Sequence, residues 1–201
     1  MSGVPWFPAW GLRFSTPVDN VPELISEIEE WRLDSRWSLI SYEVAASEVH
    51  LWSAWHKSRS NEEQGKMVAR DPGAEFLRII SGTRQIRTAI GRSGVSKGDT
   101  KAWLVRLPEI DTSGGIGETS LPIDEYNNHS KDAERLIEIV GASLIARRPF
   151  PTIEGLEKIG FLEEGVEVNS DMIEQSFLLH ASMSDFCLLY TSPSPRDPKS
   201  S

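Results

Sequence analysis

The segment 76–95 restricts the possible folds of this chain more than any other stretch of its sequence. Residues 76–80 are mostly apolar and predict a short buried strand, and the Ser-Gly pair at 81–82 predicts a tight turn after it. Residues 83–93 then predict a short helix. Gly94 follows at the position where many helices end in a left-handed cap. We therefore expect a strand, a turn and a helix in close succession.

The predicted helix has two different faces. Ile86, Ala89 and Ile90 recur at the spacing of one apolar helical face, whereas Arg84 and Arg87 fall on the opposite face. The first turn of a helix carries unpaired backbone N–H groups and a partial positive charge, so it attracts anions, most often phosphate. We therefore expect an anion site at the start of this helix. The alternative is a solvated basic helix that is paired with acidic neighbours.

Positive charge is concentrated in the same part of the chain. Residues 57–106 hold eleven Lys or Arg against five Asp or Glu, although the whole chain has a formal net charge of −9. A cationic quarter within an acidic protein indicates a local site for a polyanion. It argues against a general affinity for nucleic acid, which would need a broadly basic surface.

The remaining pattern predicts one domain of the α+β class. With 201 residues, of which 39% are hydrophobic, the chain is long enough for one well-packed core. Helices and strands mix without a regular strand–helix–strand repeat, so we expect helices packed on a mixed central sheet. We assign the domain to 1–186, with an N-terminal extension at 1–9 and an insertion at 111–128. Strands are expected at 10–14, 37–45, 76–80, 101–107 and 181–186, and helices at 20–32, 48–59, 83–93, 130–140, 152–159 and from 171.

The sequence also favours a cytoplasmic location. It contains no apolar run of the roughly 18 residues that a membrane helix needs, and no secretory signal pattern at its start. A single cysteine, Cys187, cannot form an internal disulfide. Residues 187–201 resemble the in-frame translation of a sequencing-library adapter, and we expect them to be an artefact. The alternative for 187–201 is an ordinary Ser/Pro-rich tail.

No combination of residues predicts catalysis, and no cofactor or metal is expected. The segment 113–117 resembles a phosphate-binding loop, but it lacks the Lys-Ser/Thr pair that follows in a P-loop. A nucleophile, a base and an orienting group do not occur together. Three carboxylates could pair for acid–base work, although an acidic loop is the simpler interpretation: Glu163, Glu164 and Glu167. Four histidines lie in three separate segments and do not predict a metal pair: His50, His56, His129 and His180.

The sequence at 81–90, Ser-Gly-Thr-Arg-Gln-Ile-Arg-Thr-Ala-Ile, with a glycine at 94, resembles the signature of one accessory subunit family of the KEOPS complex. This is the kinase-binding and tRNA-binding family that is typified by the PRPK-binding protein. The resemblance covers about 40–107, and the connection at 111–128 is longer than the family pattern. It implies a non-catalytic subunit that binds the complex's small atypical kinase/ATPase and recruits tRNA by its 3′ CCA end. The complex then threonylcarbamoylates the adenosine beside the anticodon.

The resemblance also implies which residues form the RNA-binding surface. A single-stranded RNA end offers phosphates and flat base faces to arginine, and base edges to an amide such as that of Gln85. A purely structural role is the alternative for each residue. Gln85 can stabilise its own helix, and Gly82 can be present only because the backbone there needs a positive φ. The implied RNA-binding residues are Lys57, Gly82, Arg84, Gln85, Arg87, Arg92, Gly94 and Lys97.

A second hypothesis is a protein-interaction module that regulates a kinase without contacting RNA. An apolar stripe on the last predicted helix would then be the kinase-docking surface, provided that it is left exposed. That stripe consists of Met172, Ile173, Phe177 and Leu178.

Overall fold

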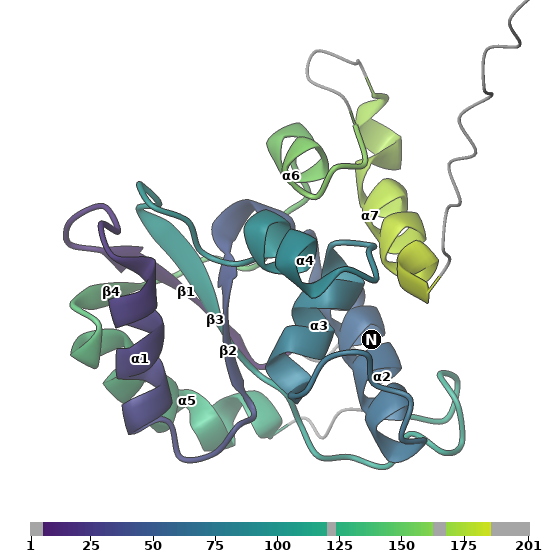
Figure 1. The fold of residues 1–201 in the computed structure, drawn as a ribbon, viewed down its shortest axis with the longest axis horizontal. Helices are drawn as coiled ribbons and strands as arrows, with labels where there is room; N and C mark the ends of the chain where they lie inside the picture. The colour runs from purple at the N-terminus through teal and green to yellow at the C-terminus, as the bar shows by residue number, and fades with distance from the viewer. Residues whose placement is uncertain (1–5, 120–123, 163–167, 186–201) are drawn as a thin grey trace, which may run out of the picture.

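The computed structural model describes residues 6–119, 124–162 and 168–185. Within these ranges the chain forms a four-stranded sheet and seven α-helices (Figure 1). The strands are β1 (Ala9–Phe14), β2 (Trp37–Ser41), β3 (Lys101–Arg106) and β4 (Ala142–Ile145). The helices are α1 (Val21–Trp31), α2 (Glu48–Glu63), α3 (Pro72–Ile80), α4 (Ile86–Ser93), α5 (Glu125–Ile139), α6 (Ile153–Lys158) and α7 (Ile173–Ser182). Three 3-10 turns complete them: η1 (Tyr42–Val44), η2 (Ser170–Met172) and η3 (Met183–Asp185).

The sheet has the strand order β2-β3-β1-β4, and every neighbouring pair is antiparallel. The α+β class is therefore confirmed, but the expectation of a mixed sheet is wrong. A mixed sheet needs a parallel pair that is joined by a crossover connection. Here the long connection between β2 and β3 instead folds into α2, α3 and α4 on one face, and returns the chain antiparallel to β2.

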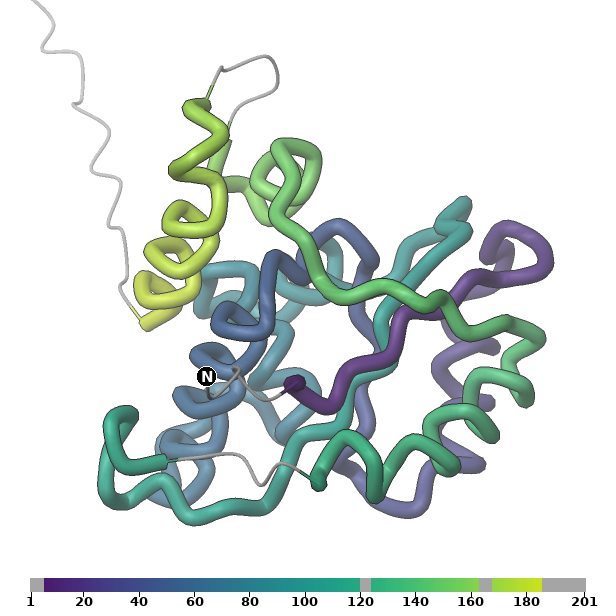
Figure 2. The backbone as a smooth tube through the Cα atoms, turned by 180° about the vertical axis from the view of Figure 1, so that it is seen from behind, coloured from purple at the N-terminus to yellow at the C-terminus, as the bar shows by residue number. Residues whose placement is uncertain are grey.

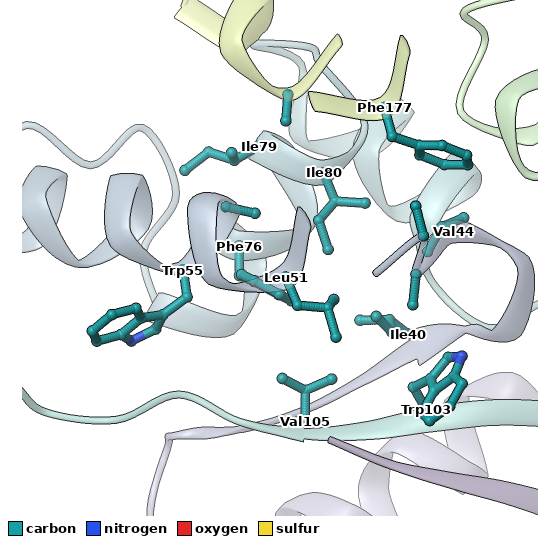
Figure 3. Packing of buried hydrophobic residues seen from close by; sticks show 14 of the residues in the cluster. Ile40, Val44, Leu51, Trp55, Phe76, Ile79, Ile80, Trp103, Val105 and Phe177 are labelled. Carbon is teal, nitrogen blue, oxygen red and sulfur yellow. The ribbon is translucent and has the colours of Figure 1, made fainter. Parts of the chain in front are cut away.

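Helices cover both faces of the sheet. Figure 1 shows α1 and α5 on one side of the strands and α2, α3 and α4 on the other. Because successive strand residues point to opposite faces, neighbours in β2 and β3 enter different cores. Ile40 and Trp103 pack with the α2–α3 side, whereas Leu39 and Leu104 pack with the α1–α5 side. The first of these two clusters is drawn in Figure 3.

Helix α7 packs on the outer side of the α2–α3 layer, and α6 packs against η1 and α7 (Figures 1 and 2). Phe177 of α7 is fully buried in the same cluster as Leu51 and Phe76 (Figure 3). Burying such a ring contributes on the order of 2–3 kcal/mol. The C-terminal helices are therefore part of the domain core and not an appendage.

The prediction of a strand at 76–80 is wrong, because these residues form the last turns of α3. The Asp71 side chain accepts a hydrogen bond from the backbone N–H of Ala74 at 2.9 Å, and Pro72 stands in the first turn. Both are strong helix-start signals. Phe76, Ile79 and Ile80 are then fully buried at helical spacing, so the apolar run is one face of a helix.

Other boundaries also differ from the predictions. Residues 183–185 form η3 and not a strand, and β4 was missed because it is short and largely exposed. Helix α5 begins at Glu125, before the predicted start at 130. Gly94 has a φ of −76° and is not a left-handed cap. The predicted acidic loop residues 163–167 and the tail at 187–201 lie outside the described residues.

Three predicted helix starts are confirmed by cap geometry. The side chains of Asn20, Ser47 and Thr152 each accept a hydrogen bond from a backbone N–H three residues later. Each bond satisfies one of the donors that the first turn leaves unpaired. These local signals set where α1, α2 and α6 begin.

Candidate nucleic-acid interface

The turn between α3 and α4 is held tightly against α7. Gly82 has a φ of +59°, and its N–H donates to the carbonyl of Ile79 at 3.0 Å. A Cβ atom on Gly82 would lie 2.6 Å from the His180 ring and 2.7 Å from the His180 carbonyl oxygen. Glycine is thus required here for its backbone conformation and for the close approach of α7. The turn places the next residues on a fixed part of the surface.

Three polar side chains after this turn are exposed. Arg84, Gln85 and Arg87 all face solvent. A guanidinium nitrogen of Arg84 donates to the backbone carbonyl of Asp185 at 3.4 Å. The Gln85 side-chain oxygen accepts a bond from the Thr88 hydroxyl at 3.1 Å, which leaves the Gln85 amide NH₂ as a donor. Within the described residues, neither Arg84 nor Arg87 forms an ion pair with an acid.

The start of α4 adds backbone donors to this surface. Gln85 occupies the N-cap position but makes no side-chain capping bond, and no acidic residue stands in the first turn. The first N–H groups of a helix have no intrahelical partner, and they carry the positive end of the helix dipole. The α4 start, which lies at Ile86 and not at the predicted residue 83, therefore places its first amide groups next to the charges of Arg84 and Arg87. An arrangement of this kind suits an anion such as phosphate.

One acidic residue lies beside the surface, and its charge is compensated. The Asp185 carboxylate forms ion pairs with Lys57 at 3.0 Å and with Arg78 at 3.0 Å. Burial alone would raise the pKa of Asp185, but hydrogen bonds and charge from Lys57 and Arg78 outweigh it and lower that pKa. Asp185 therefore stays ionised, and its carboxylate is paired with Lys57 and Arg78 and not with Arg84.

A buried ion pair fixes Asp185 in place. The Arg78 and Glu75 side chains are fully buried and lie 2.6 Å apart within α3. Arg78 also donates to the carbonyl of Ser184 at 2.8 Å, while Glu75 accepts from Asn61 at 2.8 Å. This network joins α2, α3 and η3. Sequence reasoning missed it, although the Glu-x-x-Arg spacing of Glu75 and Arg78 is a recognisable helix pair.

His180 joins α7 to both neighbouring segments and was also missed as a structural residue. Its Nε2 atom lies 2.8 Å from the carbonyl of Ser81 and 3.1 Å from that of Ile159. Both partners are acceptors, so Nε2 carries the proton. Burial lowers the pKa of His180, which keeps the ring neutral near pH 7. No signal in the sequence indicated this bridge, because its partners lie far apart along the chain.

The remaining predicted RNA-binding residues have structural contacts. Lys57 is held by Asp185, as described, and also donates to the carbonyl of Ser182 at 3.2 Å. The guanidinium of Arg92 lies against Gly160, where an added Cβ would come within 2.5 Å of it. Gly94 is buried, and a Cβ there would lie 2.6 Å from the Ile90 carbonyl oxygen.

Lys97 lies apart from the others. It forms an ion pair with Asp19 at 2.7 Å, and the neighbouring Gly98 N–H donates to the carbonyl of Val18. This segment therefore borders the turn between β1 and α1 and not α7. The structure brings Gly82, Arg84, Gln85 and Arg87 together, and places Lys97 elsewhere.

The predicted kinase-docking stripe is largely turned inward. Phe177 is fully buried and Ile173 is 9% exposed, because both pack in the core with α2 and α3. Leu178 is half-buried, whereas Met172 is 56% exposed. The condition that the stripe be exposed is thus met by Met172 alone. Leu179, which is 54% exposed, lies two turns along α7 from Met172, the N-cap of that helix.

Two further observations concern the described part of the chain. It holds no group of three or more His, Cys, Asp and Glu side chains placed to bind a metal ion. None of its helices is long and apolar enough to cross a membrane.

The fold and this surface define a binding protein of the α+β class. A family model described as "Kinase binding protein CGI-121" matches residues 16–145, which is more than half of the chain. The chain belongs to the CGI-121 family of kinase-binding proteins, which are non-catalytic subunits of the KEOPS complex. The match includes α3, the turn and α4, and ends at β4. No match was found among the curated proteins.

Proposed function

We propose that this KEOPS subunit recruits tRNA by its single-stranded 3′ CCA end, for threonylcarbamoylation of the adenosine beside the anticodon. The binding surface consists of Arg84, Gln85 and Arg87 with the first amides of α4. The observation that carries the proposal is a pair of exposed arginines that, within the described residues, have no acidic partner and lie next to an uncapped helix start. This feature stands out in a protein whose formal net charge is −9.

The chemistry of the surface suits an unpaired RNA end. The Arg84 and Arg87 guanidinium groups can each bind a phosphate or stack on a base. The free NH₂ of Gln85 can donate to a base edge, which is accessible only where the RNA is not paired. Gly82 contributes indirectly, because its backbone conformation allows the sharp turn that places these side chains on the surface. Arg92 and Lys57 support the surface through their contacts with Gly160 and Asp185.

The test compares tRNA with and without its terminal CCA by fluorescence anisotropy. We expect the intact tRNA to bind more tightly, and Arg84→Glu with Arg87→Glu to weaken its binding by about tenfold or more, because two phosphate contacts become repulsions. Arg70→Glu is the matched control, since Arg70 is also exposed but lies before the first residue of α3, at the end of that helix away from α4. Unchanged affinity after CCA removal, or after the double substitution, would refute the proposal.

We also propose that the kinase contacts the exposed side of α7, at Met172 and Leu179. These two apolar side chains are each more than half exposed; Met172 is the N-cap of α7 and Leu179 lies two turns further along, so both are on one side of the helix. Met172→Asp with Leu179→Asp should abolish co-purification with the kinase at high salt, where an apolar interface persists. Ile116→Asp, at another exposed apolar residue, is the control. Kinase binding without tRNA binding at any salt would favour the RNA-free alternative.

A further inference from the structure

A second part of the surface combines aromatic and cationic side chains at an uncovered corner of the sheet. The segment 146–152 leaves β4 and crosses to α6 (Figure 2), and beneath it lies a cavity of about 380 Å³. This volume falls within the range of pockets that bind small organic groups. The cavity is lined by Tyr42, Glu43, Lys101, Trp103, Arg147, Arg148, Phe150, Thr152 and Glu154.

The site contains two aromatic rings that pack on each other, Tyr42 and Trp103, and one that is exposed, Phe150. The Tyr42 ring stacks on the Trp103 ring with a centroid distance of 5.3 Å and an interplanar angle of 5°. The Trp103 indole N–H donates to the Tyr42 carbonyl at 2.9 Å, which fixes the pair. Phe150 is 75% exposed, the highest value among the large apolar side chains of the described residues. A ring so exposed beside a fixed aromatic pair offers a free face for stacking.

The cationic part lies beside it on the same sheet face. Arg13 of β1 and Lys101 of β3 are directly opposite in the antiparallel register. Like charges at such a position destabilise a sheet, so this pair has a cost in the free protein. The Lys101 amine lies 5.2 Å from the centroid of the Tyr42 ring. Within the described residues, no ion pair with an acid forms at Arg13, Lys101 or Arg147.

Acidic groups at this corner do not cancel the positive charge. Glu43 is held by Lys158 at 3.3 Å and by the Ser41 hydroxyl at 2.9 Å. Arg148 is paired with Glu48 at 2.6 Å, so these two charges balance each other. Lys158 also lies 3.7 Å from Asp99 and so is shared by two carboxylates. Among the described residues that line the cavity, Glu154 is the one other acid beside Lys101 and Arg147. The corner is therefore a net cationic site next to an exposed aromatic ring.

We propose that this corner binds a nucleotide of a single-stranded RNA, with its base on Phe150 and its phosphate between Lys101 and Arg147. An anionic group joined to a flat ring is the ligand chemistry that matches both halves of the site. Binding a phosphate also relieves the repulsion between Arg13 and Lys101. The inference rests on the proposed function in taking RNA as the ligand, but its residues come from η1, β1, β3 and the segment before α6.

The test uses a fluorescein-labelled single-stranded oligoribonucleotide of about 12 nucleotides ending in CCA, a length within the usual range for such sites. Phe150→Ala and Arg147→Glu should each weaken its binding by about tenfold, whereas Phe150→Tyr should bind like the unmodified protein because it keeps the ring. Leu33→Ala and Arg70→Glu are the matched controls at exposed positions. Cytidine monophosphate alone is titrated in parallel as a competitor, to separate a free nucleotide from an RNA strand.

A positional measurement accompanies the binding assay. A photoreactive thiouridine in the oligonucleotide should crosslink to the tryptic peptide 148–158, which contains Phe150. Crosslinks confined to the α3–α4 segment, or unchanged affinity of Phe150→Ala, would overturn the inference and leave the proposed function standing. Loss of kinase binding by Phe150→Ala with full RNA binding would overturn it as well, in favour of a protein contact. Absence of any RNA binding by the unmodified protein would refute both proposals.

Discussion

Gly82 and His180 lie so close together that the turn between α3 and α4 has no room for a side chain. A Cβ on Gly82 would come within 2.6 Å of the His180 ring, and the Gly82 backbone has a φ of +59°. The His180 ring in turn lies 2.8 Å from the carbonyl of Ser81. The orientation of the exposed arginines thus depends on a helix that lies about a hundred residues further along the chain.

Substitution of Gly82 should therefore destabilise the protein strongly. We expect Gly82→Ala to lower the free energy of unfolding by about 2–4 kcal/mol, from the left-handed backbone and the clash with α7. Gly91→Ala is the control, because Gly91 lies in α4 with nothing within 4 Å of an added Cβ. That change should stabilise by about 0.5–1 kcal/mol. Urea denaturation measures both, and equal effects would contradict the packing described.

The pH dependence of stability should reveal the buried His50. Burial, with a smaller effect of His180, lowers the pKa of His50 to about 3, against 6.5 for the exposed side chain. Below pH 6.5 the unfolded state binds the proton and the folded state does not, so stability falls as the pH decreases toward 3. The loss attributable to His50 is about 1.4 kcal/mol per pH unit in this range.

His50→Gln provides the comparison for this prediction. Glutamine does not titrate, and it retains an acceptor for the Ala46 N–H, which donates to His50 Nδ1 at 3.3 Å. The slope of unfolding free energy against pH between 4 and 6 should therefore become shallower. An unchanged slope would mean that other groups, such as His180, carry the pH dependence.

Breaking the buried pair of Glu75 and Arg78 should be costly. Arg78→Met leaves the Glu75 carboxylate buried without its charge partner, which typically costs about 3–5 kcal/mol. Arg87→Met, at an exposed position, should change the free energy of unfolding by less than about 0.5 kcal/mol. Thermal and urea denaturation of the two variants compare them directly. Similar stability of both would show that Arg78 does not organise η3.

The salt dependence of tRNA binding should report the number of phosphate contacts. Each phosphate neutralised on a single strand contributes roughly 0.7 to the slope of log affinity against log salt. Arg84→Gln with Arg87→Gln should therefore reduce that slope by about 1.4, if each arginine binds one phosphate. Anisotropy titrations over a salt series measure it. A reduced affinity with an unchanged slope would instead indicate base contacts.

Substitution of Lys97 is predicted to leave tRNA affinity nearly unchanged. It lies in an exposed ion pair with Asp19, away from α7. Lys97→Gln should therefore leave tRNA affinity within about twofold of the unmodified protein, since exposed pairs of this kind contribute little. A larger loss in the same anisotropy assay would extend the RNA surface toward the turn between β1 and α1.

Local signals in the sequence determined much of the fold. The caps at Asn20, Ser47 and Thr152 act within one helical turn, so they could be recognised without any tertiary information. The exposed position of Arg87 on α4 was likewise predicted from spacing alone, whereas Arg84, expected inside the helix, lies before its N-cap. The strand at 76–80 was misassigned because a short apolar run has the same composition in a strand and in a buried helix face.

Tertiary structure alone decided which charges remain free. Lys57 and Arg78 share Asp185, more than a hundred residues away, whereas Arg84 meets only a backbone carbonyl there. It also decided that Phe177 is core and Phe150 is surface. An ion pair or a packing contact forms between side chains that folding brings within a few ångströms of each other. The spacing of residues in the sequence does not indicate which residues a hundred positions apart will meet.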